Sequence, residues 1–223
     1  MKIRPSNTMK PILFNTGMVR AILDNRKTVT RRVVKPQEKI LKNPSFGYTP
    51  FTPKGHISVR GEWTDRDGNK RYGENFIKLP YCPDDILYVR ETFFEYRGHF
   101  YYKADGKHEG LARLGVYFKW QPSIHMPREA ARIFLRVTDV HVERLQRICE
   151  RGRRSAHNEG FINDISLTEG TGKSATKHFS EFWDSTIKPK DRALYGWDAN
   201  PWVWVIEFER ISREEAEHEQ NKN

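Results

Sequence analysis

The chain has little cysteine, with only Cys82 and Cys149 among 223 residues and no Cys-x-x-Cys pair. This scarcity argues against a disulfide-stapled fold or a thiolate zinc site, so two reduced thiols are expected. No stretch approaches the roughly 20 apolar residues of a membrane-spanning helix, and the first residues lack the apolar segment of a signal peptide. Because the eight histidines are scattered, no structural metal and no cofactor are expected; a loosely held divalent ion in a nuclease-type activity is the alternative. These absences predict a cytoplasmic protein with no membrane partner.

Positive charge, by contrast, is abundant. The chain carries 39 Lys and Arg residues against 29 Asp and Glu residues, which gives a net charge of +10 and a pI of about 9.6. A surplus of this size favours polyanions through counterion release and electrostatic steering. Nucleic acid or a nucleotide is therefore a plausible partner, with an ordinary solvated basic surface as the alternative. Residues 144–160 predict a basic helix that contacts RNA or DNA or is simply solvated; its arginines include Arg147, Arg151, Arg153 and Arg154.

Hydrophobic patterning predicts a fold that is α+β and mainly β. The chain is long enough for one domain with a full core, and its hydrophobic content is 37%. Alternating or continuous apolar runs predict strands at residues 9–14, 28–34, 86–91, 133–137 and 202–208. Helices are predicted from Thr16 as N-cap to Asn25, over residues 144–160, and around Phe179, Phe182 and Trp183. A partly closed barrel with two or three flanking helices follows.

Two hairpins complete the predicted organisation. Asp67-Gly68-Asn69 predicts a turn inside an insertion at residues 36–80, where proline and glycine are frequent. A second hairpin is predicted between residues 98–102 and 116–120, and Arg90 and Glu91 are expected to form a structural ion pair. Residues 1–210 then form a single domain, and residues 211–223 form a charged, flexible tail.

Four cations and two hydroxyls are concentrated in residues 25–32, Asn-Arg-Lys-Thr-Val-Thr-Arg-Arg, where a helix is expected to pass into a strand. Such a cluster gains little from packing and is penalised by self-repulsion. It indicates a place that meets an anion or lowers the pKa of a lysine.

These residues and three later motifs resemble the ASCH domain family. The motifs are the strand at residues 85–91, the Ala156-x-x-Glu159-Gly160 step and the Trp-Val-Trp-Val-Ile-Glu-Phe run at residues 202–208, in the family's order. The larger ASCH proteins of phages and prophages, which share a Met-Pro-Arg loop like that at residues 120–128, are the most similar. The resemblance covers most of residues 10–210 and implies a PUA-like β-barrel.

The family signature, G-x-K-x-x-E-x-R, is kept at Lys27 and Arg32 but has Asn25 for the glycine and Thr30 for the glutamate. A bacterial branch with threonine at that position hydrolyses the acetyl amide of N4-acetylcytidine. The resemblance therefore implies Lys27, Thr30 and Glu159 as the catalytic set. Amide hydrolysis needs a nucleophile and a base, so Thr30 would supply the hydroxyl and Lys27 a neutral amine.

Further residues are candidates for substrate binding: Arg26, Arg32, Trp120, His125 and Arg128. Arg32 is expected either to form an ion pair with a carboxylate or to bind a ligand anion. The proline-bracketed loop at residues 120–128 either stacks a base or plugs the barrel. The predicted function is hydrolysis of an N4-acylated cytidine-type nucleoside, free or in RNA; the alternatives are a non-catalytic RNA- or DNA-binding module and a ribonuclease.

Overall fold

The computed structural model describes residues 9–35, 37, 42–49, 52–65, 67–106, 110, 113, 115, 117–150, 153–162 and 174–221. Over this part of the chain the fold is α+β and mainly β. No helix described there is both long and apolar enough to cross a membrane. Both cysteines are free thiols.

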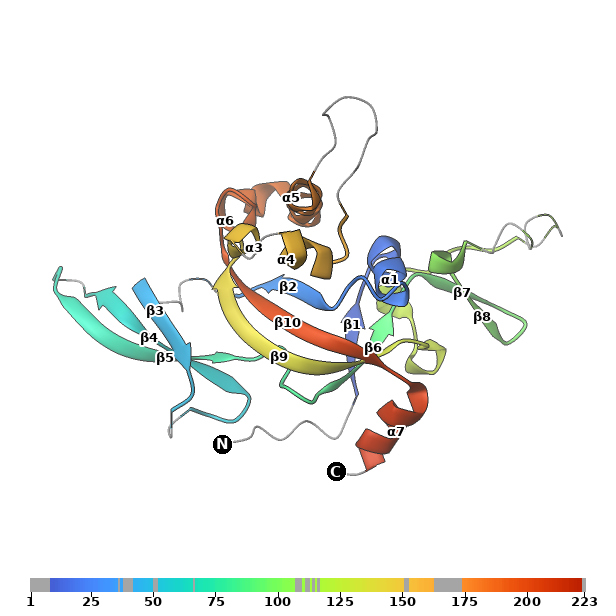
Figure 1. The fold of residues 1–223 in the computed structure, drawn as a ribbon, viewed down its shortest axis with the longest axis horizontal. Helices are drawn as coiled ribbons and strands as arrows, with labels where there is room; N and C mark the ends of the chain where they lie inside the picture. Colours follow the sequence, from blue (N-terminus) through green and yellow to red (C-terminus); the bar gives the residue numbers. More distant parts are fainter. Residues whose placement is uncertain are drawn as a thin grey trace.

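A curved, mixed five-stranded sheet forms the centre of the molecule (Figure 1). Its strand order is β1-β6-β9-β10-β2, in which only β1 and β6 are parallel. The strands are β1 (Lys10–Leu13), β6 (Ile86–Arg90), β9 (Phe134–Arg144), β10 (Trp202–Ile211) and β2 (Val29–Val33). These strands confirm the five segments predicted from the apolar runs, although β9 and β10 extend beyond them.

The two edge strands of this sheet, β1 and β2, are joined by helix α1 (Thr16–Leu23). Asn15, and not Thr16 as predicted, is the N-cap, because its side chain accepts the backbone N–H of Met18 at 2.9 Å. Asn25 has a φ of 57°, which confirms the predicted left-handed residue after the helix. The side chain of Arg32 in β2 donates a hydrogen bond to the carbonyl of Leu13 in β1 at 2.9 Å and so links the two edges.

The insertion at residues 36–80 contributes a second sheet, which extends from one end of the molecule (Figure 1). It consists of β3 (Lys42–Gly47), β4 (His56–Thr64) and β5 (Lys70–Lys78) in that order. The predicted turn between β4 and β5 is confirmed: Asp65 accepts the backbone N–H groups of Asp67 and Asn69. Ile57, Val59 and Ile77 of this sheet are buried in the main core.

The predicted second hairpin is wrong in its partner strand. β8 (His99–Tyr102) pairs with β7 (Phe93–Tyr96), across a turn in which Arg97 and Gly98 both have positive φ. Two such residues make the turn that best fits strand twist, but arginine there is not a usual turn signal. Phe118 and Trp120 pack on the ring of Phe94 instead, with ring centroids 4.2 and 5.0 Å away.

The described residues contain more helices than the two or three predicted. Besides α1 they are α3 (Arg147–Glu150), α4 (Arg153–Asn158), α5 (Ala175–Thr186), α6 (Arg192–Tyr195) and α7 (Arg213–Asn221), with 3₁₀ turns at Lys103–Asp105, Ser123–His125, Arg128–Ala130 and Pro189–Asp191. The single helix predicted over residues 144–160 is two short helices. Of its arginines, Arg151 lies outside the described residues, as do the side chains of Arg153 and Arg154.

The charged C-terminal segment is a helix, where the sequence predicted a flexible tail. α7 packs below the main sheet in Figure 1, with Ala216 fully buried against a cluster that includes Phe134 and Ile211. Gln220 of α7 accepts a hydrogen bond from Arg128 at 2.7 Å. A single small apolar residue in an otherwise charged segment was too weak a signal to predict this contact.

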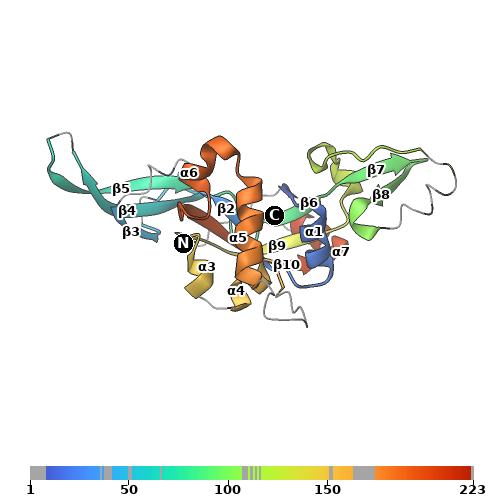
Figure 2. The same cartoon turned by 90° about the horizontal axis from the view of Figure 1, so that it is seen from above.

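On the opposite face of the sheet, α5 lies across the centre of the molecule (Figure 2). Phe179 and Trp183 on α5 pack against Val29 of β2, Val205 of β10 and Leu145. The apolar spacing that predicted this helix is thereby explained, and the same helix covers the start of β2, where the unusual cluster lies.

Candidate functional site

A cavity of about 200 Å³ lies between the start of β2, the end of β1 and helix α5. Its polar wall is formed by Lys27, Thr30, Arg31, Arg32 and Glu159. All three residues expected to be catalytic, Lys27, Thr30 and Glu159, therefore line one cavity. The chain brings Glu159 to this place from a position 132 residues after Lys27.

A short backbone bridge fixes Glu159 beside Lys27. The two residues form an isolated antiparallel bridge, and the next N–H, of Thr28, donates to the carbonyl of Asn158 at 2.8 Å. Helix α4 ends at Asn158, and Gly160 turns the chain with a φ of 92°. A Cβ on Gly160 would lie 2.7 Å from the Cβ of Ala21 and 3.3 Å from that of Lys27, so this close approach requires glycine.

The amine of Lys27 is buried and donates to three acceptors. These are the carboxylate of Glu159 at 2.7 Å, the carbonyl of Val29 at 2.6 Å and the carbonyl of Glu159 at 3.1 Å. Burial lowers the pKa of Lys27, and the adjacent Glu159 carboxylate opposes this shift. The three contacts match the three N–H groups of an ammonium. Burial, in contrast, makes the neutral form of the amine less costly than it is in water.

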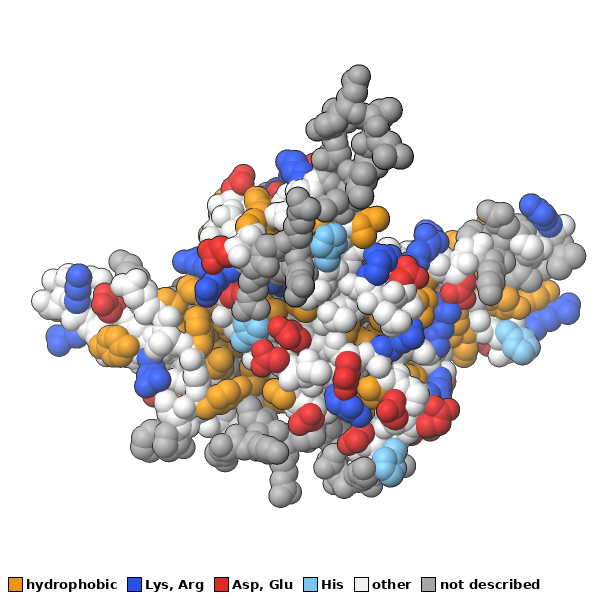
Figure 3. Space-filling view, viewed as in Figure 1, with side chains coloured by type: hydrophobic (Ala, Val, Ile, Leu, Met, Phe, Trp, Pro, Cys, Tyr) orange, Lys and Arg blue, Asp and Glu red, His pale blue; other side chains and the backbone are white. Residues whose placement is uncertain are grey.

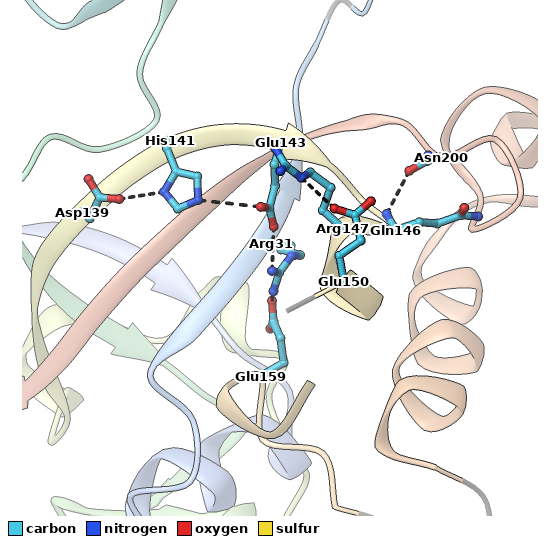
Figure 4. A network of polar contacts seen from close by, with 9 residues as sticks. All are labelled: Arg31, Asp139, His141, Glu143, Gln146, Arg147, Glu150, Glu159 and Asn200. Carbon is cyan, nitrogen blue, oxygen red and sulfur yellow. Dashed lines mark hydrogen bonds and ion pairs between the residues drawn. The ribbon is translucent and has the colours of Figure 1, made fainter. Parts of the chain in front are cut away.

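The Lys27–Glu159 pair is one end of a buried polar network. Figure 4 shows the part of this network that runs from Glu159 through Arg31 to Glu143. Arg31 donates to the other oxygen of Glu159 at 2.9 Å and to Glu143 at 2.7 Å, and all four side chains of this series are buried. Positive and negative groups alternate along it, so the two cations are offset by two carboxylates. Such an arrangement fixes the positions of its members, because each loses a close partner if another moves.

Thr30 and Arg32 differ from these residues in how their side chains are held. The hydroxyl of Thr30 makes no hydrogen bond with any residue in the described part of the chain, although the residue is 4% exposed and lines the cavity. The Arg32 guanidinium lies over the ring of Phe14, 5.6 Å from its centroid, and pairs with no carboxylate among the described residues. The wall thus presents a hydroxyl and a cation to a ligand.

The remaining wall of the cavity is largely apolar and aromatic. It is formed by Phe14 and Met18 on one side and by Phe179, Phe182 and Trp183 of α5 on the other. Aromatic and apolar surfaces of this kind accept planar, weakly hydrated groups. The sequence identified Phe179, Phe182 and Trp183 only as a helix face, and their spacing carried no sign of the cavity.

The other expected binding residues do not line this cavity. Arg26 is exposed and donates to the carbonyl of Gly160 at 2.8 Å, which places it beside the turn at Gly160. Trp120 packs in the Phe94 cluster, and His125 is exposed in a 3₁₀ turn. Arg128 lines a separate cavity, also about 200 Å³, beneath α7. Only Arg32 of the five remains beside Lys27.

The predicted Arg90–Glu91 ion pair is also wrong. Glu91 is buried and forms a two-pronged pair with Arg132, at 2.8 and 3.0 Å, while Arg90 donates to the carbonyl of Ile124. Adjacent residues of a strand point to opposite faces, so side chains 90 and 91 diverge.

Sequence reasoning missed two members of the polar network as site residues, Arg31 and Glu143. Their signal was the alternation Asp139-Val-His141-Val-Glu143, which places three polar side chains on one face of β9. A buried acid within a strand predicts a buried cation on the same face of the sheet, and Arg31 of β2, which lies across β10 from Glu143, is that cation.

Comparison with protein-family models, curated proteins and solved structures finds no match to this chain.

Proposed function

We propose that this chain is an amidohydrolase with a PUA-like fold of the ASCH type, and that the Lys27 cavity removes the acyl group from an N4-acylated cytidine-type nucleoside. The observation that carries the proposal is that Lys27 and Thr30 line one cavity together with Glu159. Glu159 belongs to a second motif, 132 residues after Lys27 in the chain. The link between edge strands β1 and β2 through Arg32 supports a partly closed barrel.

The size and lining of the cavity suit a base with a small acyl group. Its volume of about 200 Å³ is below the roughly 300–1,000 Å³ of pockets that enclose drug-sized ligands. The aromatic side chains of α5 offer a surface for stacking a pyrimidine. A free nucleoside, or a nucleotide turned out of an RNA strand, would place the base inside and the sugar at the opening.

The charge of the site favours an uncharged reacting group. Glu159 and Glu143 offset Lys27 and Arg31, which leaves Arg32 as the unpaired cation among the described residues of the wall. A bound phosphate in contact with Lys27 would hold the lysine in its charged form. The amide of an acylated base carries no such charge and leaves the lysine free to exchange its proton.

These positions support a mechanism in two stages. Lys27 in its neutral form takes the hydroxyl proton of Thr30 while the threonine oxygen attacks the acyl carbon, and the Glu159 carboxylate holds the amine in position. The proton held by Lys27 then moves to the departing N4 amine of the base. The same lysine then deprotonates a water, which attacks the threonine ester. As the ester bond breaks, the lysine gives this proton to the threonine oxygen, so the carboxylic acid leaves and both Thr30 and the neutral Lys27 are restored.

The test is deacetylation of N4-acetylcytidine, followed by chromatography. We expect turnover by the wild type and none by Lys27→Ala or Lys27→Arg, because a guanidinium does not serve as a base at neutral pH. The matched control is Arg26→Lys, which keeps an exposed cation next to the site in sequence. Turnover by Lys27→Arg would contradict the base role, and inactivity of the wild type would contradict the proposed reaction.

RNA or DNA binding without catalysis is the second candidate, and the net charge of +10 favours it. A nuclease is the third. A nuclease that uses a divalent ion would lose all cleavage in EDTA, whereas hydrolysis through Lys27 and Thr30 needs no metal.

A further inference from the structure

Three potential metal ligands meet on the strand pair β9–β10, outside the Lys27 cavity. Asp139, His141 and Glu207 each offer one ligand atom, and these atoms lie within 4.8 Å of one another. Asp139 and His141 are two residues apart on the same face of β9, and Glu207 of β10 is the cross-strand neighbour of Asp139. Figure 3 shows a histidine side chain beside acidic side chains over these strands.

A β-bulge interrupts the pairing of β9 and β10 next to the cluster. The register of β9 and β10 shifts between Glu207 and Phe208, where Thr138 is the extra residue opposite them. Bulges of this kind redirect neighbouring side chains and are frequent beside functional sites. Here the shift lies immediately next to the Asp139–Glu207 pair.

The two carboxylates of the cluster face each other without a Lys or Arg partner among the described residues. Like charges directly opposite in an antiparallel pair destabilise a sheet. No Lys or Arg in the described part of the chain pairs with Asp139 or Glu207, whereas the next acid along β10, Glu209, pairs with Arg136 at 2.8 Å. A cation bound between Asp139 and Glu207 would remove this repulsion.

The histidine has a carboxylate near each of its ring nitrogens. Its Nδ1 lies 2.7 Å from the carboxylate of Asp139, so this nitrogen faces the cluster. Its Nε2 is buried, makes no hydrogen bond with the described residues, and points to the buried carboxylate of Glu143 at 3.9 Å (Figure 4). A histidine ligand usually donates its second ring N–H to such a carboxylate; here Glu143 lies on that side of the ring, beyond hydrogen-bond distance.

We infer that Asp139, His141 and Glu207 form a binding site for one divalent metal ion of the zinc class. One imidazole nitrogen and two carboxylate oxygens are a ligand set that zinc accepts, with a fourth position left for water. The inference goes beyond the proposed function and does not depend on it. Glu143, which lies on the Nε2 side of His141, accepts a hydrogen bond from Arg31, so the ion would bind at the far end of the network that positions Lys27.

The experiment measures Zn²⁺ binding to the untagged protein by calorimetry and Co²⁺ binding by visible absorption. We expect one ion per chain in the wild type and at least about a tenfold loss of affinity in His141→Ala and in Glu207→Gln, since even outer supports of a ligand contribute about 10–100-fold. His99→Gln and Glu209→Gln are the controls, because His99 is exposed on β8 and Glu209 is two residues from Glu207 on the same strand.

Thermal unfolding gives a second readout that a merely structural role would not reproduce. In EDTA we expect Glu207→Gln to unfold at a higher temperature than the wild type, because the opposed charges are gone, and in Zn²⁺ at a lower one. Glu209→Gln, which breaks the pair with Arg136, should unfold at a lower temperature in both. Equal Zn²⁺ affinity in wild type and Glu207→Gln, or absence of binding to the wild type, would overturn the inference.

Discussion

At the scale of single residues, two opposing effects act on the pKa of Lys27. Burial lowers its pKa, and three acceptors, one of them charged, favour the ammonium. A base must lose this proton before it acts, so the rate of deacetylation depends on the lowered pKa.

We therefore expect kcat/KM for N4-acetylcytidine to rise with pH and to level off below pH 10.5, the ordinary lysine value. The rate rises with pH because the neutral amine of Lys27 is the active form, and this amine is protonated at low pH. Because the pKa of Lys27 is lowered, the rise occurs at a pH closer to neutral than for an ordinary lysine. The measurement is a pH–rate profile from about pH 6 to 10, which extends from well below the ordinary lysine pKa to just under it. A rate that falls over this range would assign Lys27 a role as a cation.

Glu159 should carry a large stability effect, because it is the shared partner of Lys27 and Arg31. We expect Glu159→Gln to lower the free energy of unfolding by about 3–5 kcal/mol, the usual result of breaking a buried pair on one side. The loss should shrink as pH rises, because Lys27 then becomes neutral.

The matched control is Glu150→Gln, whose exposed pair with Arg147 contributes about 1 kcal/mol or less. Urea unfolding of both variants and the wild type measures the difference. Similar losses in the two variants would show that the Lys27 network adds nothing beyond a surface pair.

At the scale of elements, the turn after α4 sets the geometry of the cavity. Gly160 and Gly98 both have positive φ, but only at Gly160 would a Cβ meet neighbouring atoms within 3 Å. We expect Gly98→Ala to destabilise by about 1–2 kcal/mol, from backbone strain alone. Gly160→Ala should add about 1–3 kcal/mol of overpacking and also slow deacetylation, since it displaces Lys27.

Denaturant unfolding and turnover of the two alanine variants provide the comparison. An equal effect of both substitutions on stability, with turnover unchanged, would mean that the backbone of the turn adjusts to the added Cβ without displacing Lys27.

Local patterns predicted the elements but not all of their partners. The apolar runs of β1, β2, β6, β9 and β10 and the spacing of α5 are properties of short segments, and these predictions are confirmed. The pairing of β8 with β7 was missed because the turn uses Arg97 at positive φ. The packing of α7 was missed because it depends on one alanine, Ala216, in a charged helix.

The same limit applies to the site. Lys27, Thr30 and Glu159 came from motifs, and whether they catalyse stays a prediction. Arg31 and Glu143 were missed because their importance arises from a contact across 112 residues. Asp139 and Glu207 became neighbours only through the register of β9 and β10.

At the scale of the whole molecule, the net charge of +10 separates two kinds of ligand. We expect binding to single-stranded RNA to weaken steeply between about 50 and 200 mM salt, in proportion to the phosphates contacted. Turnover of the free nucleoside should hardly change, since the cavity meets an uncharged group. Fluorescence anisotropy and chromatography measure the two, and an RNA affinity independent of salt would argue against phosphate contacts.

The position of β10 has a consequence for synthesis of the protein. Although it is the last strand in the described part of the chain, β10 lies between β9 and β2 and pairs with both. While the ribosome is still translating residues before 202, β2 has no partner in the sheet and the wall that carries Thr30 is not yet in place. The nascent chain therefore exposes an open strand edge until residues 202–211 emerge, and such an edge tends to pair with other chains.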